Sequence, residues 1–314
     1  MNNKIINDVI DNIEKVLIGR SNEVINILKG ILAGGHILID DVPGVGKTTL
    51  IKVLAKTLSL TCNRIQFTPD LLPTDITGVS IFNQKSLEFE FRKGPIFSNV
   101  ILADEINRAT PRTQSALLQA MEERQVTEGS KTYKIGDPFI VLATENPIEY
   151  EGTFPLPEAE LDRFIIKTSI GYPEFRDEIK ILQVYKDHNP MNNIKSIFNE
   201  GDIKEIQEAV KHIHVELNVY EYIVNVIEQT RNNEYIKLGA SVRGSMALMR
   251  VAQANAFIQG RKYVIPEDVK ENVKLVLSHR LVLSSLALKD KLTVEDIIDK
   301  ILNRVPMPKV IIND

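Results

Sequence analysis

The sequence predicts an α/β fold, in which a parallel sheet of five strands is covered by helices and followed by an all-α C-terminal domain. In the first half, short apolar runs bounded by turn residues alternate with helical patterns, which is typical of strands covered on both faces. After Gly171-Tyr172-Pro173, apolar residues recur at helical spacing instead. We therefore expect two domains, residues 1–172 and 173–314, with a boundary near residue 172.

Five apolar runs are the predicted strands of this sheet: 36–40, 62–67, 100–103, 139–144 and 164–170. We interpret Cys62, on the second run, as a small core residue. Helices are expected over 47–58 and from Pro111, because threonine followed by proline is typical of an N-cap and first helical turn. Alternation at 87–91 and a Gly129-Ser130 turn predict two projecting inserts, near 79–93 and 125–135.

The second half contains apolar stripes at helical spacing and one clear helix start. Val219, Tyr222, Val226 and their neighbours fall on one face, as do the apolar residues of 269–277. Thr293-Val294-Glu295-Asp296 resembles a capping box. These patterns predict a helical C-terminal domain.

Composition narrows the class of protein. The 314 residues are 43% hydrophobic and 25% charged, which argues against disorder, and the net charge of −4 argues against a basic nucleic-acid-binding domain. The single cysteine fits a reducing compartment. The N-terminus lacks a secretory signal pattern, and the apolar stretch 30–39 is shorter than the roughly 20 residues a bilayer span needs. We expect a cytoplasmic protein without a membrane span.

A phosphate-binding loop is predicted between the first strand and the helix that follows. Backbone N–H groups of the run Gly44-Val45-Gly46-Lys47-Thr48 can surround a β-phosphate at the helix N-terminus. Lys47 would reach the β- and γ-phosphates, and the Thr48 hydroxyl would bind magnesium. Asp41 stands where the strict pattern has its first glycine, and aspartate tolerates left-handed backbone better than most residues.

Asp104-Glu105 close the apolar strand 100–103 and supply the carboxylates that a hydrolase needs. Asp104 suits a magnesium shell, and Glu105 suits a general base that polarises attacking water. Together with the loop, they predict an ATPase that binds ATP or ADP with Mg²⁺.

Several motifs jointly resemble the MoxR family of AAA+ ATPases over almost the whole chain. They are Asp40 to Thr48, Gln66 to Gly78, Ala103 to Ala109, Gln119 to Glu123, Ala143 to Pro147, Gly152 to Phe164 and Gly239 to Arg243. The resemblance implies an AAA+ P-loop αβα core with a helical lid.

The resemblance also implies roles for residues that are unremarkable alone. Asn146 would be sensor 1, Arg163 the arginine finger that reaches a neighbouring subunit's ATP, and Arg243 sensor 2, which brings the lid onto the phosphates. Ile18-Gly19 would approach the adenine. The nucleotide-binding residues expected from the loop and the resemblance together are Ile18, Gly19, Pro43, Gly44, Val45, Gly46, Lys47, Thr48, Thr49, Asp104 and Arg243.

Three positions depart from the family's usual pattern. Asp41 replaces a glycine, Glu145 stands where glutamine is commoner, and Val242 stands where proline is common. None removes a catalytic group.

The leading hypothesis is an ATP-driven, chaperone-like remodelling machine that matures partner complexes, including cofactor or metal insertion. The resemblance implies a homo-hexameric ring and a partner with a von Willebrand factor A domain. The alternatives are a magnesium-chelatase-like motor subunit, a nucleic-acid translocase, which the acidic charge argues against, and a nucleotide-sensing scaffold that does not hydrolyse ATP.

Overall fold

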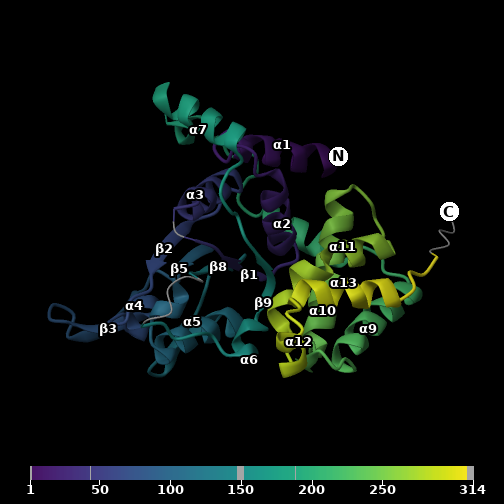
Figure 1. Ribbon diagram of the computed structural model, residues 1–314. Helices are drawn as coiled ribbons and strands as arrows, with labels where there is room; N and C mark the ends of the chain where they lie inside the picture. Colours follow the sequence, from purple (N-terminus) through teal and green to yellow (C-terminus); the bar gives the residue numbers. More distant parts are fainter. Residues whose placement is uncertain (1, 43, 147–151, 188, 310–314) are drawn as a thin grey trace.

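The computed structural model describes residues 2–42, 44–146, 152–187 and 189–309 (Figure 1). Its centre is a five-stranded parallel sheet with the order β2-β5-β8-β1-β9, which confirms the predicted fold class. The strands are β1 (His36–Asp40), β2 (Cys62–Gln66), β5 (Val100–Asp104), β8 (Ile140–Glu145) and β9 (Phe164–Thr168). All five predicted strands are present; the bounds of β1 match the prediction, and the ends of the others differ by two residues at most.

Alternate residues of the central strands enter two different cores, as a period of two requires. On β5, Leu102 joins one apolar cluster while Ile101 and Ala103 join the other. Helices cover both faces: α1 (Asn2–Glu14), α2 (Ser21–Leu32), α3 (Lys47–Thr57), α4 (Pro73–Thr77), α5 (Pro111–Glu123) and α6 (Glu158–Leu161), with a 3-10 turn η1 (Ile106–Arg108). The alternation of apolar residues along the strands therefore supplies both faces of the sheet with a core for the helices to pack against.

The edge strand β2 differs from the prediction of a strand covered on both faces. Asn63, Arg64 and Gln66 are exposed, and Cys62 is only partly buried rather than a core residue. β2 is the edge strand of the sheet and contacts α3; Asn63 lies on one of its faces, and Arg64 and Gln66 lie on the other. This leaves Arg64 and Gln66 available to the active-site edge.

Two antiparallel hairpins lie outside the sheet where inserts are predicted. They are β3 (Gly78–Asn83) with β4 (Glu88–Lys93), and β6 (Gln125–Glu128) with β7 (Lys131–Lys134). The first projects from the core in Figure 1. Gly78 has φ 103°, and a β-carbon at this position would lie 2.3 Å from Arg92 O and 2.6 Å from Gly94 N, so no side chain fits there.

The C-terminal half is helical, as predicted, with one small difference. Its elements are α7 (Phe175–Asp187), η2 (Pro190–Asn193), α8 (Asp202–Lys211), α9 (Leu217–Arg231), α10 (Val242–Ile258), α11 (Pro266–Leu277), η3 (Ser278–Arg280), α12 (Ser285–Lys289) and α13 (Val294–Arg304). A two-stranded sheet, β10 (Ile236–Leu238) with β11 (Val282–Leu283), corrects the all-α prediction. The Thr293 capping box is present, since its hydroxyl accepts from Asp296 N at 3.1 Å.

Polar contacts join these helices to the core. Lys29 Nζ donates to Asn272 Oδ1 at 3.0 Å, and Gln207 Nε2 donates to Ile31 O at 2.7 Å, both in buried surroundings. Arg280 Nε donates to Asp162 Oδ1 at 2.7 Å. One apolar cluster also continues from α1–α3 into α9–α13. The division at residue 172 stays a prediction.

Within the described ranges, the helices are all too short or too polar to cross a bilayer.

Candidate active site

The phosphate loop joins β1 to α3 through two glycines in left-handed conformations. Gly44 has φ 87° and Gly46 has φ 92°, values that residues with side chains rarely adopt. Because α3 begins at Lys47, the free N–H groups of its first turn open toward the loop. The other predicted loop residues in the described chain are Val45, Thr48 and Thr49; the predicted Pro43 lies outside the described residues.

Asp41 is an anchor for the loop and not a substitute for a left-handed glycine. Its φ is not in the left-handed region, contrary to the reason expected for its tolerance. Its buried carboxylate accepts from three backbone N–H groups: Ile170 at 2.5 Å, Gly171 at 2.8 Å and Val42 at 3.0 Å. The Asp41 carboxylate therefore holds the chain that follows β9 in place beside the loop. Lys47 Nζ donates to the Asp41 carbonyl oxygen at 2.8 Å.

The two predicted acidic residues stand at the end of β5, beside the loop. Asp104 is buried, and its Oδ1 accepts from Thr144 Oγ1 at 2.7 Å. Its Oδ2 accepts from Arg64 Nε at 3.1 Å and Nη2 at 2.7 Å. The parallel register pairs Gln66 with Asp104, which explains why polar residues of β2 reach this carboxylate edge.

Glu105 adopts a left-handed conformation with φ 57° and ψ 52°, which is costly for a residue with a side chain. Its N–H donates to Thr144 Oγ1 at 2.8 Å, which holds this turn. Its Oε2 accepts from Gln66 Nε2 at 2.9 Å and from Arg108 Nη1 at 3.1 Å. The carboxylate that the sequence predicts as general base is thus oriented by two donors.

A cleft of about 350 Å³ unites these groups. It is lined by Gly44, Gly46, Lys47, Thr48, Arg64, Gln66, Asp104 and Glu105. Thr48 and Asp104 supply hydroxyl and carboxylate oxygens of the kind Mg²⁺ prefers, and the Asp104 carboxylate already pairs with a cation, the guanidinium of Arg64. The residues present therefore fit a magnesium-bound phosphate ligand.

The sequence did not point to Arg64, Gln66 or Thr144. Arg64 and Gln66 are two residues apart on a predicted strand, so the sequence does indicate that their side chains share one face. Which face they share, and which neighbour they meet, depends on the strand order. Thr144 lies in a predicted strand and in the motif Ala143 to Pro147, but neither assigns it a role.

Asn146 is buried directly after β8, at the same carboxyl edge of the sheet, but it is not among the residues that line the cleft. The preceding Glu145 pairs in register with Asp40 of β1. Burial raises the pKa of Glu145; Lys167 opposes this rise and the Asp40 carboxylate adds to it. Lys167 Nζ and Asp40 Oδ2 form an ion pair at 2.6 Å.

Ile18 and Gly19 lie at the rim near the chain that follows β9. Gly19 has φ 73°, a conformation that favours glycine, and a β-carbon at this position would meet the carboxylate of Asp177 on α7. Arg20 Nη2 donates to Gly171 O at 2.9 Å. Neither Ile18 nor Gly19 lines the phosphate cleft itself.

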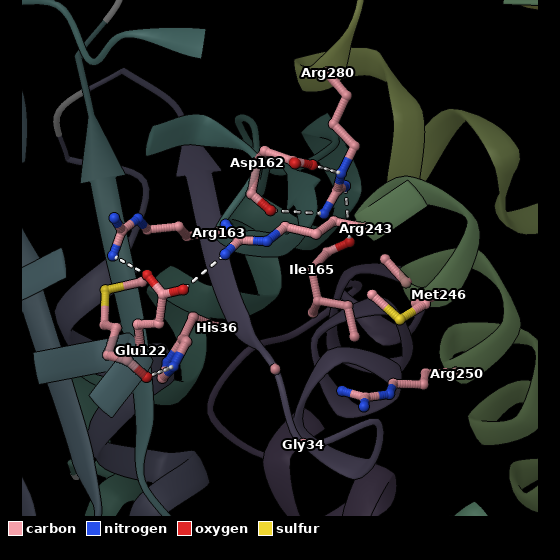
Figure 2. Close-up of a pocket in the computed structure, with 13 residues that line it drawn as sticks. Gly34, His36, Glu122, Asp162, Arg163, Ile165, Arg243, Met246, Arg250 and Arg280 are labelled. Atoms are coloured by element: carbon pink, nitrogen blue, oxygen red, sulfur yellow. Dashed lines mark hydrogen bonds and ion pairs between the residues drawn. The ribbon is translucent and has the colours of Figure 1, made fainter. Parts of the chain in front are cut away.

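Arg163 and Arg243 lie together in a second cavity of about 270 Å³, away from the phosphate cleft (Figure 2). Glu122 joins them: its Oε2 pairs with Arg163 Nη1 at 2.7 Å and its Oε1 with Arg243 Nη2 at 2.7 Å. Arg163 Nη1 also donates to Leu118 O at 2.8 Å. Arg243 therefore shares a cavity with Arg163 and does not line the phosphate cleft of its own chain.

Comparisons with known proteins cover both halves of the chain. Residues 36–166 match the model of the ATPase family associated with various cellular activities (AAA), and residues 228–301 match the AAA lid domain. The chain is 45% identical to protein YeaC of Bacillus subtilis, covering 97% of this chain and 95% of that protein. It is 41% identical to Chaperone MoxR1 of Mycobacterium tuberculosis, covering 95% and 81%. A crystal structure of a candidate ATPase from Cytophaga hutchinsonii superposes with a TM-score of 0.91 at 41% identity, covering 98% and 96%.

Proposed function

Because the chain belongs to the MoxR family of AAA ATPases, we propose that it hydrolyses ATP at a site completed by two copies of the chain. The observation that carries this proposal is the separation of the catalytic groups. Lys47, Thr48, Asp104 and Glu105 line one cleft, whereas Arg163 and Arg243 line another cavity of the same chain.

The phosphate cleft performs the steps that one chain can supply. The N–H groups of the loop and the first turn of α3 bind phosphate oxygens, and the ammonium of Lys47 exchanges the Asp41 carbonyl for phosphate. Thr48 and Asp104 would hold Mg²⁺, which neutralises charge on the phosphates when bound. Glu105 polarises the attacking water and accepts its proton at a carboxylate oxygen, with Asn146 positioning that water.

Arg163 and Arg243 act on the nucleotide of the neighbouring copy. A permanent cation with forked donors stabilises the charge that develops on the transferred phosphoryl group. Glu122 holds both guanidiniums in one place, with 2.7 Å to each, so they can be presented as a pair. A repeated contact of one face with a different face forms a ring when the rotation between copies closes, and we propose such a closed ring, a homo-hexamer.

The sharpest test mixes two inactive variants. Glu105→Gln lacks the base, and Arg163→Ala lacks the neighbour's cation, so we expect each alone to lose about 10²-fold or more in turnover. In a 1:1 mixture, about a quarter of randomly formed interfaces pair an intact base with an intact arginine. Steady-state ATPase activity should therefore reappear on mixing.

The matched control is a mixture of Glu105→Gln with a variant that carries both substitutions, which contains no intact interface and should stay inactive. If the first mixture is no more active than the average of its components, the shared site is wrong. ATP binding without turnover by the wild-type protein at any concentration would favour the nucleotide-sensing scaffold instead.

For the client, we propose chaperone-like remodelling of a partner complex, with a protein that contains a von Willebrand factor A domain. The M. tuberculosis relative, Chaperone MoxR1, is named as a chaperone, which supports the proposal of chaperone-like remodelling. The Glu105→Gln protein with ATP should retain clients, so affinity capture identifies them. If the captured clients include no protein with a von Willebrand factor A domain, the proposed partner is wrong. If DNA or RNA stimulates ATP turnover, the translocase is favoured instead.

A further inference from the structure

Helix α7 presents an apolar stripe that nothing in the described chain covers. Phe175, Ile179 and Leu182 recur at helical spacing and are 80%, 41% and 68% exposed. None of the apolar side chains of α7 joins either core cluster, and within the described residues no other helix or strand packs along it. Figure 1 shows α7 extending away from the rest of the molecule at the top of the view. An apolar stripe of this length on a soluble helix marks a contact surface.

The base of α7 is fixed to the nucleotide side of the molecule. The backbone N–H groups of Ile170 and Gly171 are held by Asp41 of the phosphate loop region, and Gly171 O accepts from Arg20. The Asp177 carboxylate on α7 lies against Gly19. The helix that carries the exposed stripe therefore begins on the side of the molecule that holds the phosphate loop.

A complementary surface lies beside those arginines. Val242 and Met246 on α10 are 66% and 46% exposed, and they flank Arg243, with Leu238 of β10 also exposed nearby in sequence. Met246 and Arg250 line the same cavity as Arg163 and Arg243 (Figure 2). Within the described chain Arg250 has no ion-pair partner, so this surface combines apolar area with uncompensated positive charge.

The start of α7 carries a net negative charge: the acids Glu174, Asp177 and Glu178 outnumber Arg176 and Lys180, and Lys180 pairs with Asp177. Glu178 lies in the first turn, and Glu174 precedes it; both are exposed and neither forms an ion pair within the described residues. An acidic first turn followed by an apolar stripe matches an apolar patch next to Arg250. Complementary charge orients such a contact and raises its association rate.

We propose that α7 of one copy packs against the α10 surface of the next copy, formed by Leu238, Val242, Met246 and Arg250. This inference rests on the proposed shared site, because docking the arginines of one copy onto the cleft of another brings these two surfaces to the same interface. The occupant of the α7 stripe is thus a second copy of this chain. The contact would fix the distance between the neighbour's arginines and the phosphates.

Cysteine cross-linking tests the contact directly. In a Cys62→Ser background, which removes the only cysteine, one protein carries Ile179→Cys and the other Met246→Cys. After mixing with ATP and Mg²⁺ and mild oxidation, a covalent two-chain species should form only when both proteins are present. A two-chain species from Ile179→Cys alone would show α7 paired with α7, and an internal bridge in a chain carrying both cysteines would show α7 folded onto its own lid. Either result, or no cross-link in the mixture, overturns the proposal.

A second measurement uses exposed leucines with matched accessibility. Leu182→Asp on α7 should weaken self-association in sedimentation velocity by about tenfold or more, since a buried charge is costly at an interface. Leu217→Asp on α9, at 70% exposed against 68% for Leu182, should leave it unchanged. Equal behaviour of the two variants would contradict the docking surface.

The mixing test for turnover separates the two proposals. Recovered ATPase activity without the cross-link would retain the shared site and reject the α7 contact. The cross-link without recovered activity would retain the contact and reject the shared catalytic mechanism.

Discussion

The phosphate cleft and the arginine cavity hold their charged groups in different ways. In the cleft, Lys47, Asp104 and Glu105 follow directly from a strand end or a helix start, and each is bonded to backbone or to a buried neighbour. In the cavity, Arg163 and Arg243 are half-exposed side chains joined through one carboxylate, Glu122. The cleft is preorganised by the fold, whereas the two arginines are joined to each other only through the Glu122 side chain, and Arg163 has one further bond, to Leu118 O.

This difference indicates where assembly enters the mechanism. Preorganised donors cost no reorganisation when the reaction occurs. The arginines must instead exchange Glu122 for a phosphate of another molecule, and this exchange takes place only at an interface. Substitutions in the cleft should therefore change the protomer itself, and substitutions in the cavity should change communication between protomers.

Asp41→Gly gives the largest expected effect on the cleft, and it is counterintuitive from the sequence. The change restores the glycine of the strict phosphate-loop pattern but removes the acceptor for three backbone N–H groups. Leaving two or more of these donors unpaired should cost roughly 2–4 kcal/mol in the free energy of unfolding. Urea unfolding followed by circular dichroism measures this loss, and nucleotide affinity should fall with it.

Asp40→Asn is the matched control for that prediction. Asp40 is the adjacent acid, but it forms a partly exposed ion pair with Lys167, and such a pair contributes about 0–1 kcal/mol. A more stable Asp41→Gly protein, or equal losses for the two variants, would mean that the Asp41 carboxylate does not anchor the loop.

Glu122→Gln tests the arginine cavity, with an intermediate expected effect. The amide keeps the shape of the side chain but loses the charge that pairs with both guanidiniums at 2.7 Å. We expect turnover of the assembled protein to fall about tenfold, since catalytic side chains placed loosely lose rate, while the stability of the protomer changes by less than about 1 kcal/mol.

Glu123→Gln, one residue further along α5, is its control, because Glu123 makes no ion pair within the described residues. Steady-state turnover measured against protein concentration separates a weaker assembly from a weaker site. If Glu122→Gln lowers the free energy of unfolding as much as Asp41→Gly does, the phosphate cleft and the arginine cavity do not differ in how far the fold preorganises them.

The same contrast explains how far the sequence could be interpreted. Strand patterns, the glycines of the loop and Asp104-Glu105 are local signals, and the structure confirms the fold that they predict. The contacts of Arg64 and Gln66 with the acidic pair depend on β2 lying beside β5, and the bridge through Glu122 depends on the position of the lid. The role of Asp41 depends on the chain after β9. No local pattern encodes these long-range partners.

Glu145→Gln should have the smallest effect, and it concerns the edge of the cleft. Burial raises the pKa of Glu145, so the folded chain holds this proton more tightly than the unfolded chain. The resulting stabilisation is present below the ordinary carboxyl pKa, about 4.3, and it is lost as the pH rises through the raised value. At neutral pH the charged carboxylate therefore costs stability, and the neutral amide, the residue expected more often at this position, should unfold at a slightly higher urea concentration, by less than about 1 kcal/mol. Urea titrations of both proteins between about pH 4 and pH 8 should show this advantage shrinking as the pH falls. An advantage that is constant over this range would assign it to hydrogen bonding of the amide and not to the buried charge.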